Sequence, residues 1–185
     1  MYYIVVNKGK ILSKTESNNE PVGHTELDLD DYKNVTFDEY GNCSHDYIDG
    51  EINYIDNSEN YLSNKKKDLI NYCKMQSGIK IKNGVDYKLK ENGFVKMPND
   101  LHDQINYLAM SVAALQGGFE GQKIKDKNRE WVDIKPDELK DITDKVAASV
   151  AYWVDWNGVK EDVINACTTL EELEELENTI NTELE

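Results

Sequence analysis

The sequence predicts an α+β protein, in which a small N-terminal β-module precedes a mixed domain of helices and β-hairpins with a helical C-terminus. Three observations indicate this class. Short runs rich in β-forming residues, such as residues 2–6, occupy the start of the chain. Apolar residues recur at helical spacing further on, as in residues 139–153. Asn-Gly pairs and short alternating runs between the helical stretches indicate hairpins. We place the two domains at residues 1–57 and 58–185.

The N-terminal module is predicted from its β-forming runs. Residues 2–6 form a first strand, residues 7–10 a turn, and residues 11–13 the returning strand. Residues 25–29 alternate polar and apolar side chains, which predicts a third, half-exposed strand. A module of about 40–55 residues is near the lower size for independent folding, so we expect it to dock on a neighbouring protein by edge-strand pairing. The candidate interface residues here are Tyr2, Tyr3, Ile4 and Val5.

A polar segment at residues 57–67 is predicted to be a hinge, and a helix follows it. Leu69, Ile70 and Cys73 can share one face of this helix. Gly78 suits the position just beyond a helix end, because glycine adopts the left-handed conformation that many helix ends require. We therefore expect the helix to end at Gly78.

The segment after Gly78 predicts a small β-meander. Asn83-Gly84 is the strongest short hairpin signal in the chain, and residues 79–81 and 85–89 are its flanking strands. Asn92-Gly93 then turns the chain into a further strand at residues 94–97.

The next helix is introduced by Pro98 and by Asn99 or Asp100, and Gly117-Gly118 stops it. Apolar side chains cover much of its surface, so we expect it to be largely buried. These side chains are Ile105, Leu108, Met110, Val112 and Leu115.

A β-pair that turns at Lys127-Asn128 leads into a long amphipathic helix. Pro136 suits the first helical position, with Lys135 as the cap and Glu138 at the third position. The apolar stripe has spacings of 3, 4, 4 and 3 residues, and consists of Leu139, Ile142, Val146, Val150 and Trp153. Asn157-Gly158 is expected to break the helix, with a short helix after it.

The three tryptophans differ in their expected environments. Periodic placement predicts that Trp131 and Trp153 lie in the core. Trp156 stands beside Asn157-Gly158 at an expected helix end. It is therefore the candidate for an interface, where tryptophan is enriched.

The last helix begins at residues 168–172 (Thr-Thr-Leu-Glu-Glu), which is typical of a capping box. Its outer face is nearly all glutamate, so in isolation it would suffer like-charge repulsion and must pack its apolar stripe on something. Two alternatives are open from the sequence, namely this domain or a partner helix. The candidate interface residues on the stripe are Leu173, Leu176 and Ile180.

The net charge of -15 is concentrated at the two ends of the chain. Residues 1–60 carry 13 acidic and 4 basic groups, residues 61–167 carry 16 and 17, and residues 168–185 carry 7 acidic groups and no basic one. Such a chain repels a phosphate backbone and an anionic membrane surface. We therefore expect no nucleic acid and no membrane among its partners.

Cysteine usage and the N-terminal residues indicate where the chain is made. Cys43, Cys73 and Cys167 are widely spaced and odd in number, which is not a disulfide framework and favours a reducing compartment. The apolar run at residues 2–6 is too short for a signal peptide, and no stretch approaches the ~20 apolar residues of a membrane span. We expect synthesis in the cytoplasm without a signal peptide.

Chemically reactive patterns are sparse. Cys43 and His45 form the one Cys/His cluster, and they lack the second pair of ligands that a tetrahedral zinc site needs. Residues 126–130 begin like a calcium loop, but Trp131 occupies the position that must be glycine, so we predict a hairpin turn. Phosphate-binding glycine motifs do not occur. We predict no catalytic, cofactor-binding or metal-binding residue and no cofactor.

Five segments of the second half carry a resemblance to a known domain through their order and spacing. They are the 78–87 region, Asp103-Gln104-Ile105-Asn106, Trp131-Val132-Asp133-Ile134, the helix that contains Leu139, and Ala166-Cys167-Thr168-Thr169-Leu170. Together, over about residues 63–176, they resemble a C-terminal domain of unknown function that recurs in phage tail proteins. The N-terminal half resembles the short β-module that often precedes this domain. Lys135 departs from the family pattern, in which a Thr or Ser cap precedes the long helix.

The resemblance implies a non-enzymatic structural component of a phage tail or of a phage-like contractile bacteriocin, acting as adaptor or spacer at the baseplate or tail fibre. The alternative is a tail-fibre assembly chaperone that binds the fibre during maturation and is absent from the finished particle. Other tail, baseplate or fibre proteins would be the partners, and tail symmetry would allow a homo-oligomer. The chain would be located in the tail of the particle. A small enzyme is the third hypothesis, and it would need a reactive constellation that the sequence does not offer.

Overall fold

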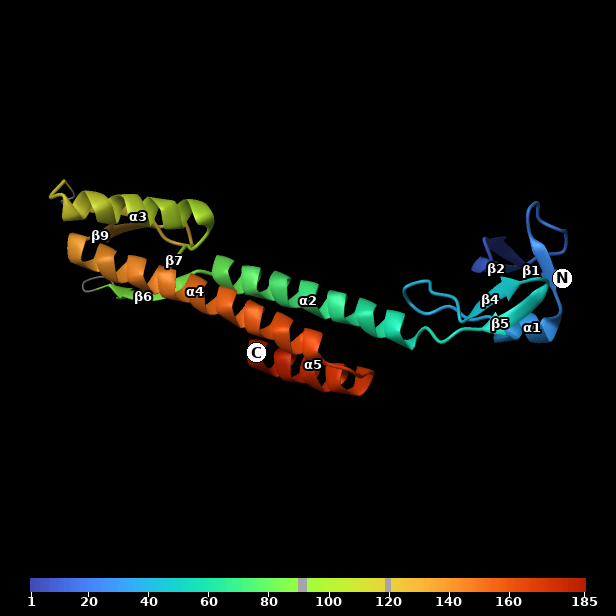
Figure 1. Cartoon of the computed structure of the whole chain (residues 1–185). Coiled ribbons are helices and arrows are strands. Elements are labelled where there is room, and N and C mark those ends of the chain that lie inside the picture. The colour runs from blue at the N-terminus through green and yellow to red at the C-terminus, as the bar shows by residue number, and fades with distance from the viewer. Residues whose placement is uncertain (90–92, 119–120) are drawn as a thin grey trace. The chain divides into compact units, whose positions relative to one another are not determined.

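The computed structural model describes residues 1–89, 93–118 and 121–185 (Figure 1). The predicted α+β class is confirmed, with a β-rich N-terminal part followed by helices and hairpins and a helical C-terminus. The chain forms two compact units, Met1–Asp68 and Leu69–Glu185. The boundary between them falls inside helix α2 (Ser58–Lys82), whereas the sequence placed it at residues 57/58. Each unit is described by itself below.

The N-terminal unit is built on a five-stranded antiparallel sheet in the order β3-β1-β2-β4-β5. The strands are β1 (Tyr2–Asn7), β2 (Lys10–Glu16), β3 (Thr25–Leu27), β4 (His45–Ile48) and β5 (Glu51–Tyr54). The three strands predicted from the sequence are therefore present, and the first two join through the predicted turn. Gly9 adopts a φ of 82° there, a conformation that glycine reaches at little cost.

The core of this unit lies against the sheet. Its buried members are Ile4, Ile11, Val35 and Cys43, and half-buried apolar side chains pack around them. Val35 follows the short helix α1 (Leu29–Asn34), which Asp28 caps by accepting a hydrogen bond from Asp31 N at 2.8 Å. A unit of this size has a small core, so each of these residues matters for its stability.

The first turns of α2 belong to the N-terminal unit. Lys65 forms a 2.6 Å ion pair with Glu39, and the Tyr40 hydroxyl donates to Asp68 at 2.7 Å. The segment at residues 57–67, which the sequence predicted as a hinge, is therefore helical from Ser58 onwards.

The C-terminal unit contains two hairpins and the C-terminal part of α2, together with three further helices. Its elements are β6 (Val85–Leu89), β7 (Gly93–Met97), α3 (Leu101–Leu115), β8 (Gln122–Lys125), β9 (Trp131–Ile134), α4 (Pro136–Ala166) and α5 (Leu170–Leu184). The hairpins are joined where Lys127 N donates to Lys96 O at 2.7 Å. Both hairpins share one core with α3 and the N-terminal half of α4. That core includes Tyr87, Met97, Tyr107, Ile134, Leu139 and Ile142.

The helix starts predicted from capping chemistry are confirmed. Asp100 caps α3, accepting from Asp103 N at 3.0 Å. Lys135 N donates to Glu138 at 3.1 Å at the start of α4, with Pro136 in the first helical position. Thr169 caps α5, accepting from Glu172 N at 3.2 Å. These starts depend on residues at most three positions apart, which is why the sequence reveals them.

Two predicted helix ends are wrong. α2 continues through Gly78 to Lys82, so residues 79–81 are helical and not a strand. α4 continues through Gly158 to Ala166 as one helix. A glycine inside a helix costs about 1 kcal/mol, whereas burying one large apolar side chain such as Ile164 contributes about 1.5–3 kcal/mol. In α4, packing of Ile164 beyond Gly158 therefore outweighs the local preference of the glycine. In α2, residues 79–82 are exposed or half-buried, so packing of this kind does not explain why the helix continues past Gly78.

Asn83-Gly84 connects a helix to a strand, and the hairpin that the sequence placed there lies further along, between β6 and β7. Of the second predicted turn, Asn92 lies outside the described residues, and Gly93 is the first residue of β7. The turn at Lys127-Asn128 is confirmed between β8 and β9. There the Asp126 carboxylate accepts from Asn128 N at 2.9 Å and from Glu130 N at 2.8 Å, which fixes a tight turn.

Substituting alanine at Gly84 and at Gly78 should have opposite effects. Gly84 has a φ of 84°, and a Cβ there would overlap the carbonyl oxygen of Met97. We expect Gly84→Ala to destabilise the C-terminal unit by about 1–3 kcal/mol. Gly78 is helical and its Cβ would enter open space, so Gly78→Ala should stabilise by about 0.5–1 kcal/mol.

Urea denaturation followed by tryptophan fluorescence measures both changes, because all three tryptophans lie in the C-terminal unit. A lower midpoint for Gly78→Ala would contradict the continuous α2 helix and favour a helix end at Gly78.

Candidate interaction surface

The N-terminal interface candidates lie inside the sheet. β1 pairs with β2 on one side and with β3 on the other, so the outer strands of the sheet are β3 and β5. Tyr3 and Ile4 are buried, with 1% and 0% of their surfaces exposed, while Tyr2 and Val5 are half-buried. Edge-strand pairing through β1 is therefore blocked in this fold, and β5, with Tyr54 exposed, takes the outer position.

The stripe of the last helix packs within the chain, which decides between the two alternatives left open by the sequence. Leu173 and Ile180 are buried and Leu176 is half-buried. α5 lies beside the C-terminal half of α4 (Figure 1), and it is also joined to α2, where the Tyr72 hydroxyl donates to Asn181 at 3.0 Å. Glu171, Glu174, Glu175 and Glu177 of α5 are thereby left exposed.

Trp156, the tryptophan expected at an interface, instead joins α4 to α5. Its side chain is buried, and Nε1 donates to Glu183 Oε2 at 2.9 Å. Lys160 Nζ donates to the other oxygen of Glu183 at 2.7 Å. Trp131, predicted in the core, is 65% exposed, and Trp153 is half-buried. β9 is a four-residue strand whose buried side chains are Val132 and Ile134, so alternation sends Trp131 to the outer side.

The Glu183 carboxylate makes the α4–α5 contact dependent on pH. The hydrogen bond from Lys160, followed by the one from Trp156, holds the pKa of Glu183 below its usual value. Because the folded pKa is lower than the unfolded one, the ionised carboxylate stabilises the fold above about pH 4.3, and this contribution is lost as the pH falls through the folded pKa.

We therefore expect Glu183→Gln to be less stable than the natural chain near neutral pH, with the difference shrinking at acidic pH. Urea midpoints measured by tryptophan fluorescence over a pH series test this expectation. Glu177→Gln, on the exposed side of α5, controls for the loss of one negative charge. A difference that stays constant with pH would show that these hydrogen bonds do not depend on the charge of Glu183.

Helix α3 carries an exposed apolar face that the sequence did not reveal. Its side chains are between 45% and 87% exposed, and they are Leu101, Ile105, Leu108, Val112 and Leu115. We call these five residues the α3 face. The expectation that this helix is largely buried is therefore wrong, because Tyr107 is its one fully buried residue. Five largely exposed aliphatic side chains present on the order of 500 Å² of apolar surface, which matches the largest patches on monomeric proteins.

The orientation of α3 follows from its contacts with the rest of the unit. Tyr107 enters the core and its hydroxyl donates to Pro98 O at 3.1 Å. The Ser111 and Thr143 hydroxyls are 2.8 Å apart, which ties α3 to α4. Met110 and Ala114 pack against the same core. With 3.6 residues per turn, these side chains point away from the α3 face.

A hollow of about 520 Å³ adjoins the C-terminal end of the α3 face. It lies between α3 and α4, and Leu115 belongs to both the hollow and the α3 face. Its lining includes Ala114 and Pro136 together with Lys140 and Asp144, which form a 2.5 Å ion pair at the rim. The apolar surface of α3 therefore continues into a shallow depression.

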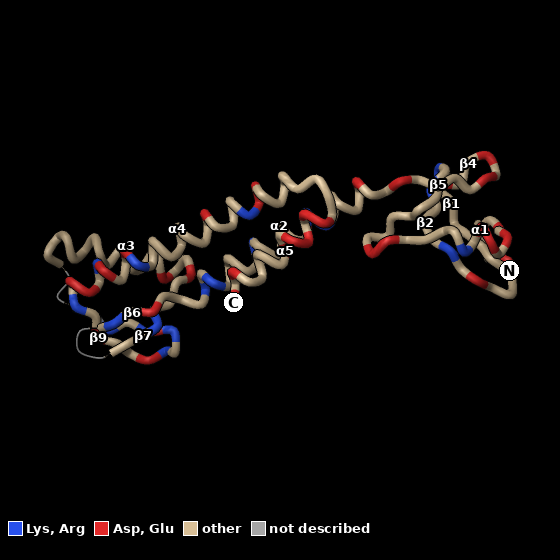
Figure 2. Tube along the Cα trace, turned by 90° about the horizontal axis from the view of Figure 1, so that it is seen from below, with Lys and Arg blue, Asp and Glu red and all other residues tan. Residues whose placement is uncertain are grey.

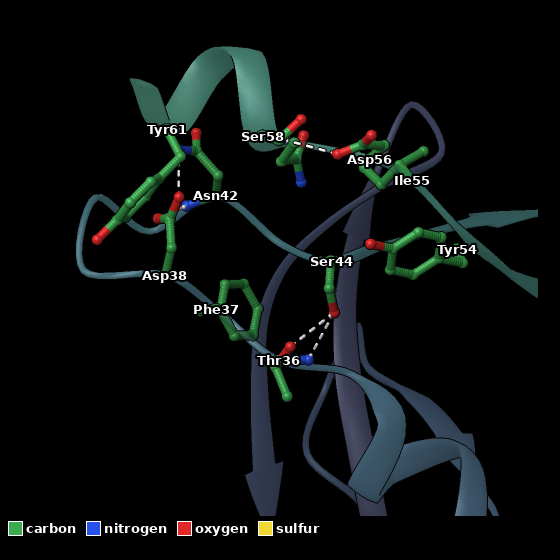
Figure 3. Close-up of a pocket in the computed structure, with 11 residues that line it drawn as sticks. Thr36, Phe37, Asp38, Asn42, Ser44, Tyr54, Ile55, Asp56, Ser58 and Tyr61 are labelled. Carbon is green, nitrogen blue, oxygen red and sulfur yellow. Dashed lines mark hydrogen bonds between the residues drawn. The ribbon is translucent and has the colours of Figure 1, made fainter. Parts of the chain in front are cut away.

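A second hollow, of about 310 Å³, lies in the N-terminal unit (Figure 3). The loops around Asp38 and Asp56 and the start of α2 form its walls. Asp38 accepts from Tyr40 N at 2.9 Å, and from Asn42 N and Nδ2, both at 2.8 Å. Asp56 accepts from Ser58 N at 2.9 Å. Both carboxylates are thus engaged in fixing local turns.

The charge state of these carboxylates agrees with a structural role. Burial, the largest single influence on Asp38, raises its pKa, but the hydrogen bonds from Asn42 and from neighbouring backbone amides together bring that pKa below its usual value. Hydrogen bonds from Ser58 likewise lower the pKa of Asp56. Groups that stay ionised in this way are poorly matched to proton transfer near neutral pH.

The Cys43–His45 cluster is also engaged in the fold. Cys43 is buried, and burial raises the pKa of its thiol, so the unreactive protonated form is favoured. His45 Nδ1 lies 2.7 Å from Ser44 Oγ. Ser44 Oγ in turn accepts from Thr36 N at 2.9 Å (Figure 3). All three cysteines of the chain are free.

Within residues 1–89, 93–118 and 121–185, no three His, Cys, Asp or Glu side chains gather in a way that could hold a metal ion. None of the helices in this part of the chain is long and apolar enough to cross a membrane. Comparisons with protein-family models, with curated proteins and with solved structures found no match for the chain.

Proposed function

We propose that this chain is a non-enzymatic adaptor that works by docking on other protein chains, and that the α3 face is its main docking surface. The observation that carries the proposal is the row of exposed aliphatic side chains from Leu101 to Leu115 on a helix whose other side is fixed to the core. Exposed apolar patches of this size, rimmed by polar residues, mark interaction sites in soluble proteins.

The biological setting that we propose is the tail of a phage or of a phage-like contractile bacteriocin, at the baseplate or tail fibre. This setting rests on the sequence resemblance described above. Other tail, baseplate or fibre proteins and further copies of this chain would be the partners, and the adaptor would remain in the particle after its synthesis in the cytoplasm.

A tail-fibre assembly chaperone is the second candidate, and the α3 face favours it as well. A chaperone needs an apolar surface that is open before the client arrives and open again after it leaves. An adaptor in a finished particle would keep this surface covered. The two functions therefore differ in whether the chain stays bound.

Purified particles test both candidates. We expect the chain in washed particles at a fixed ratio to the major tail proteins, and we expect the double substitution Leu108→Glu with Val112→Glu to remove it. The matched control is Val159→Glu with Val163→Glu, because these positions on α4 have the same spacing and are 50% and 44% exposed, against 61% and 45% for the α3 pair. Presence in lysate bound to fibre and absence from particles would support the chaperone. Equal incorporation of both variants would overturn the α3 face as the docking surface.

A further inference from the structure

We infer that the occupant of the α3 face is α3 of a second copy of this chain, packed antiparallel about a two-fold axis. This inference rests on the proposed use of the α3 face as a docking surface, and it names the partner.

The spacing of the α3 face suits helix pairing. Its five residues follow one another at intervals of 4, 3, 4 and 3, which is the pattern of the apolar positions in a coiled-coil seam. We place the two-fold axis of the antiparallel pair perpendicular to the helices, midway between Asn106 and Tyr107. Ile105 then contacts Leu108 of the second copy. Leu101 then meets Val112 of the second copy, so four of the five residues find apolar partners.

The positions that flank the seam carry no charge that would specify a different protein. His102, Gln104, Ala109, Ser111 and Gln116 occupy them. Heterotypic helix pairs select their partners through complementary charges at such positions, and here none of these side chains is acidic or always cationic. In an antiparallel pair of identical helices, each flanking position faces the same position of the second copy, so a charged residue there would meet a like charge. The uncharged flanking positions of α3 avoid this repulsion.

The direction of pairing follows from the carboxylates at the start of the helix. Asp100 and Asp103 form the capping box of α3. A parallel pair would bring four of these carboxylates together, whereas an antiparallel pair about this axis separates the two sets by about 10–20 Å along the helices. That distance exceeds the Debye length of about 8 Å at physiological salt. Antiparallel pairing therefore avoids the repulsion.

The area is sufficient for association when both copies contribute. Two α3 faces present on the order of 1,000 Å² of apolar surface before any flanking contact is added, which is comparable with the lower limit for a specific interface. The hollow beside Leu115 gives each copy further apolar surface next to the seam.

The charges of this unit lie mostly elsewhere. Lys and Arg gather on the two hairpins (Figure 2). α3 contacts the N-terminal half of α4, whereas α5, which is rich in glutamate and has no Lys or Arg, contacts the C-terminal half. Because each chain carries a net charge of -15, two copies repel one another at long range. Salt screens this repulsion without weakening an apolar seam, so the dimer should tighten as the salt concentration rises.

Sedimentation equilibrium of the full chain tests the inference. We expect a reversible monomer–dimer equilibrium whose dissociation constant falls when NaCl is raised from about 50 to about 500 mM. Leu108→Glu with Val112→Glu should raise that constant by about 100-fold or more, whereas Val159→Glu with Val163→Glu should leave it within about threefold. The inference is contradicted if the chain stays monomeric at every concentration, or if it binds an added tail protein one-to-one as a monomer.

Cysteine cross-linking tests the direction of pairing, on a Cys167→Ser background that leaves only the two buried native cysteines. An equal mixture of Leu101→Cys and Val112→Cys chains should give a disulfide-linked dimer that neither variant forms by itself. Efficient linkage of Leu101→Cys alone would indicate a parallel pair and overturn the proposed geometry.

The two proposals fail in different ways. If the natural chain is monomeric and the α3 double variant is lost from particles, the α3–α3 dimer is refuted and the docking function of the α3 face is supported. If the natural chain forms a dimer that the double variant abolishes, but the double variant still enters particles normally, the dimer is supported and the docking function is refuted.

Discussion

Trp156→Ala should destabilise the C-terminal unit by about 3–5 kcal/mol, the range for removing a large buried aromatic side chain. The indole is 9% exposed and joins α4 to α5. Truncation leaves a cavity between the helices, and it removes one of the two donors that hold Glu183. The urea midpoint, followed by fluorescence of the remaining tryptophans, should fall sharply.

Trp131→Ala is the matched control, because it makes the same chemical change in the same unit at a 65% exposed position. Its effect should be within about 1 kcal/mol, as is usual for surface substitutions. The sequence predicted the reverse, with Trp131 in the core and Trp156 at an interface. A larger loss of stability for Trp131→Ala than for Trp156→Ala would contradict the burial of Trp156 between α4 and α5 and would favour Trp131 as the core residue.

The loss at Trp156 should be greatest in α5. Six glutamates and no basic residue make this helix marginal without its packing partners. Hydrogen exchange should therefore accelerate most for the α5 amides in Trp156→Ala, ahead of the amides of the β6–β7 hairpin. Uniform acceleration throughout the unit would instead indicate a single cooperative block.

Local chemistry made part of this fold predictable. The starts of α3, α4 and α5 were predicted because each depends on side chains within three residues of the helix start, although Asn99 and Asp100 were both left as candidates for the cap of α3. The β8–β9 turn was found for the same reason, since Asp126 bonds to amides two and four residues along. Features of this kind are encoded in a short window and do not depend on the rest of the chain.

Helix ends and the burial of α3 could not be predicted in this way. Gly78 and Gly158 suit helix ends on local grounds, but the helix continues through each of them, and beyond Gly158 the buried Ile164 stabilises the continuation. The apolar residues of α3 indicated burial because composition shows how much of a helix is apolar and not how much of it the fold covers. Here the core takes one side, through Tyr107, and leaves the α3 face open. The sequence therefore identified the apolar residues of the α3 face, but it did not show that they are exposed.

Ile4→Ala should unfold much of the N-terminal sheet. Ile4 is fully buried at the centre of the core formed with Ile11, Val35 and Cys43, and truncation of such a side chain costs about 2–5 kcal/mol. A unit this small has little stability to lose. Amide hydrogen exchange in β1 and β2 should accelerate by about 30-fold or more, because each 1.4 kcal/mol is a factor of ten.

Ile48→Ala makes the same change in the same unit at a 50% exposed position, and it should alter this protection by less than about fivefold. The comparison separates the two roles that have been assigned to β1. If β1 is a central strand, Ile4→Ala loses protection first and any docking defect follows from unfolding. If Ile4→Ala kept full protection and still lost a partner, the strand would have to be accessible, which its pairing with both β2 and β3 opposes. The position of β1 in the sheet therefore makes its apolar residues part of the core, and any docking by this unit must use its exposed surface.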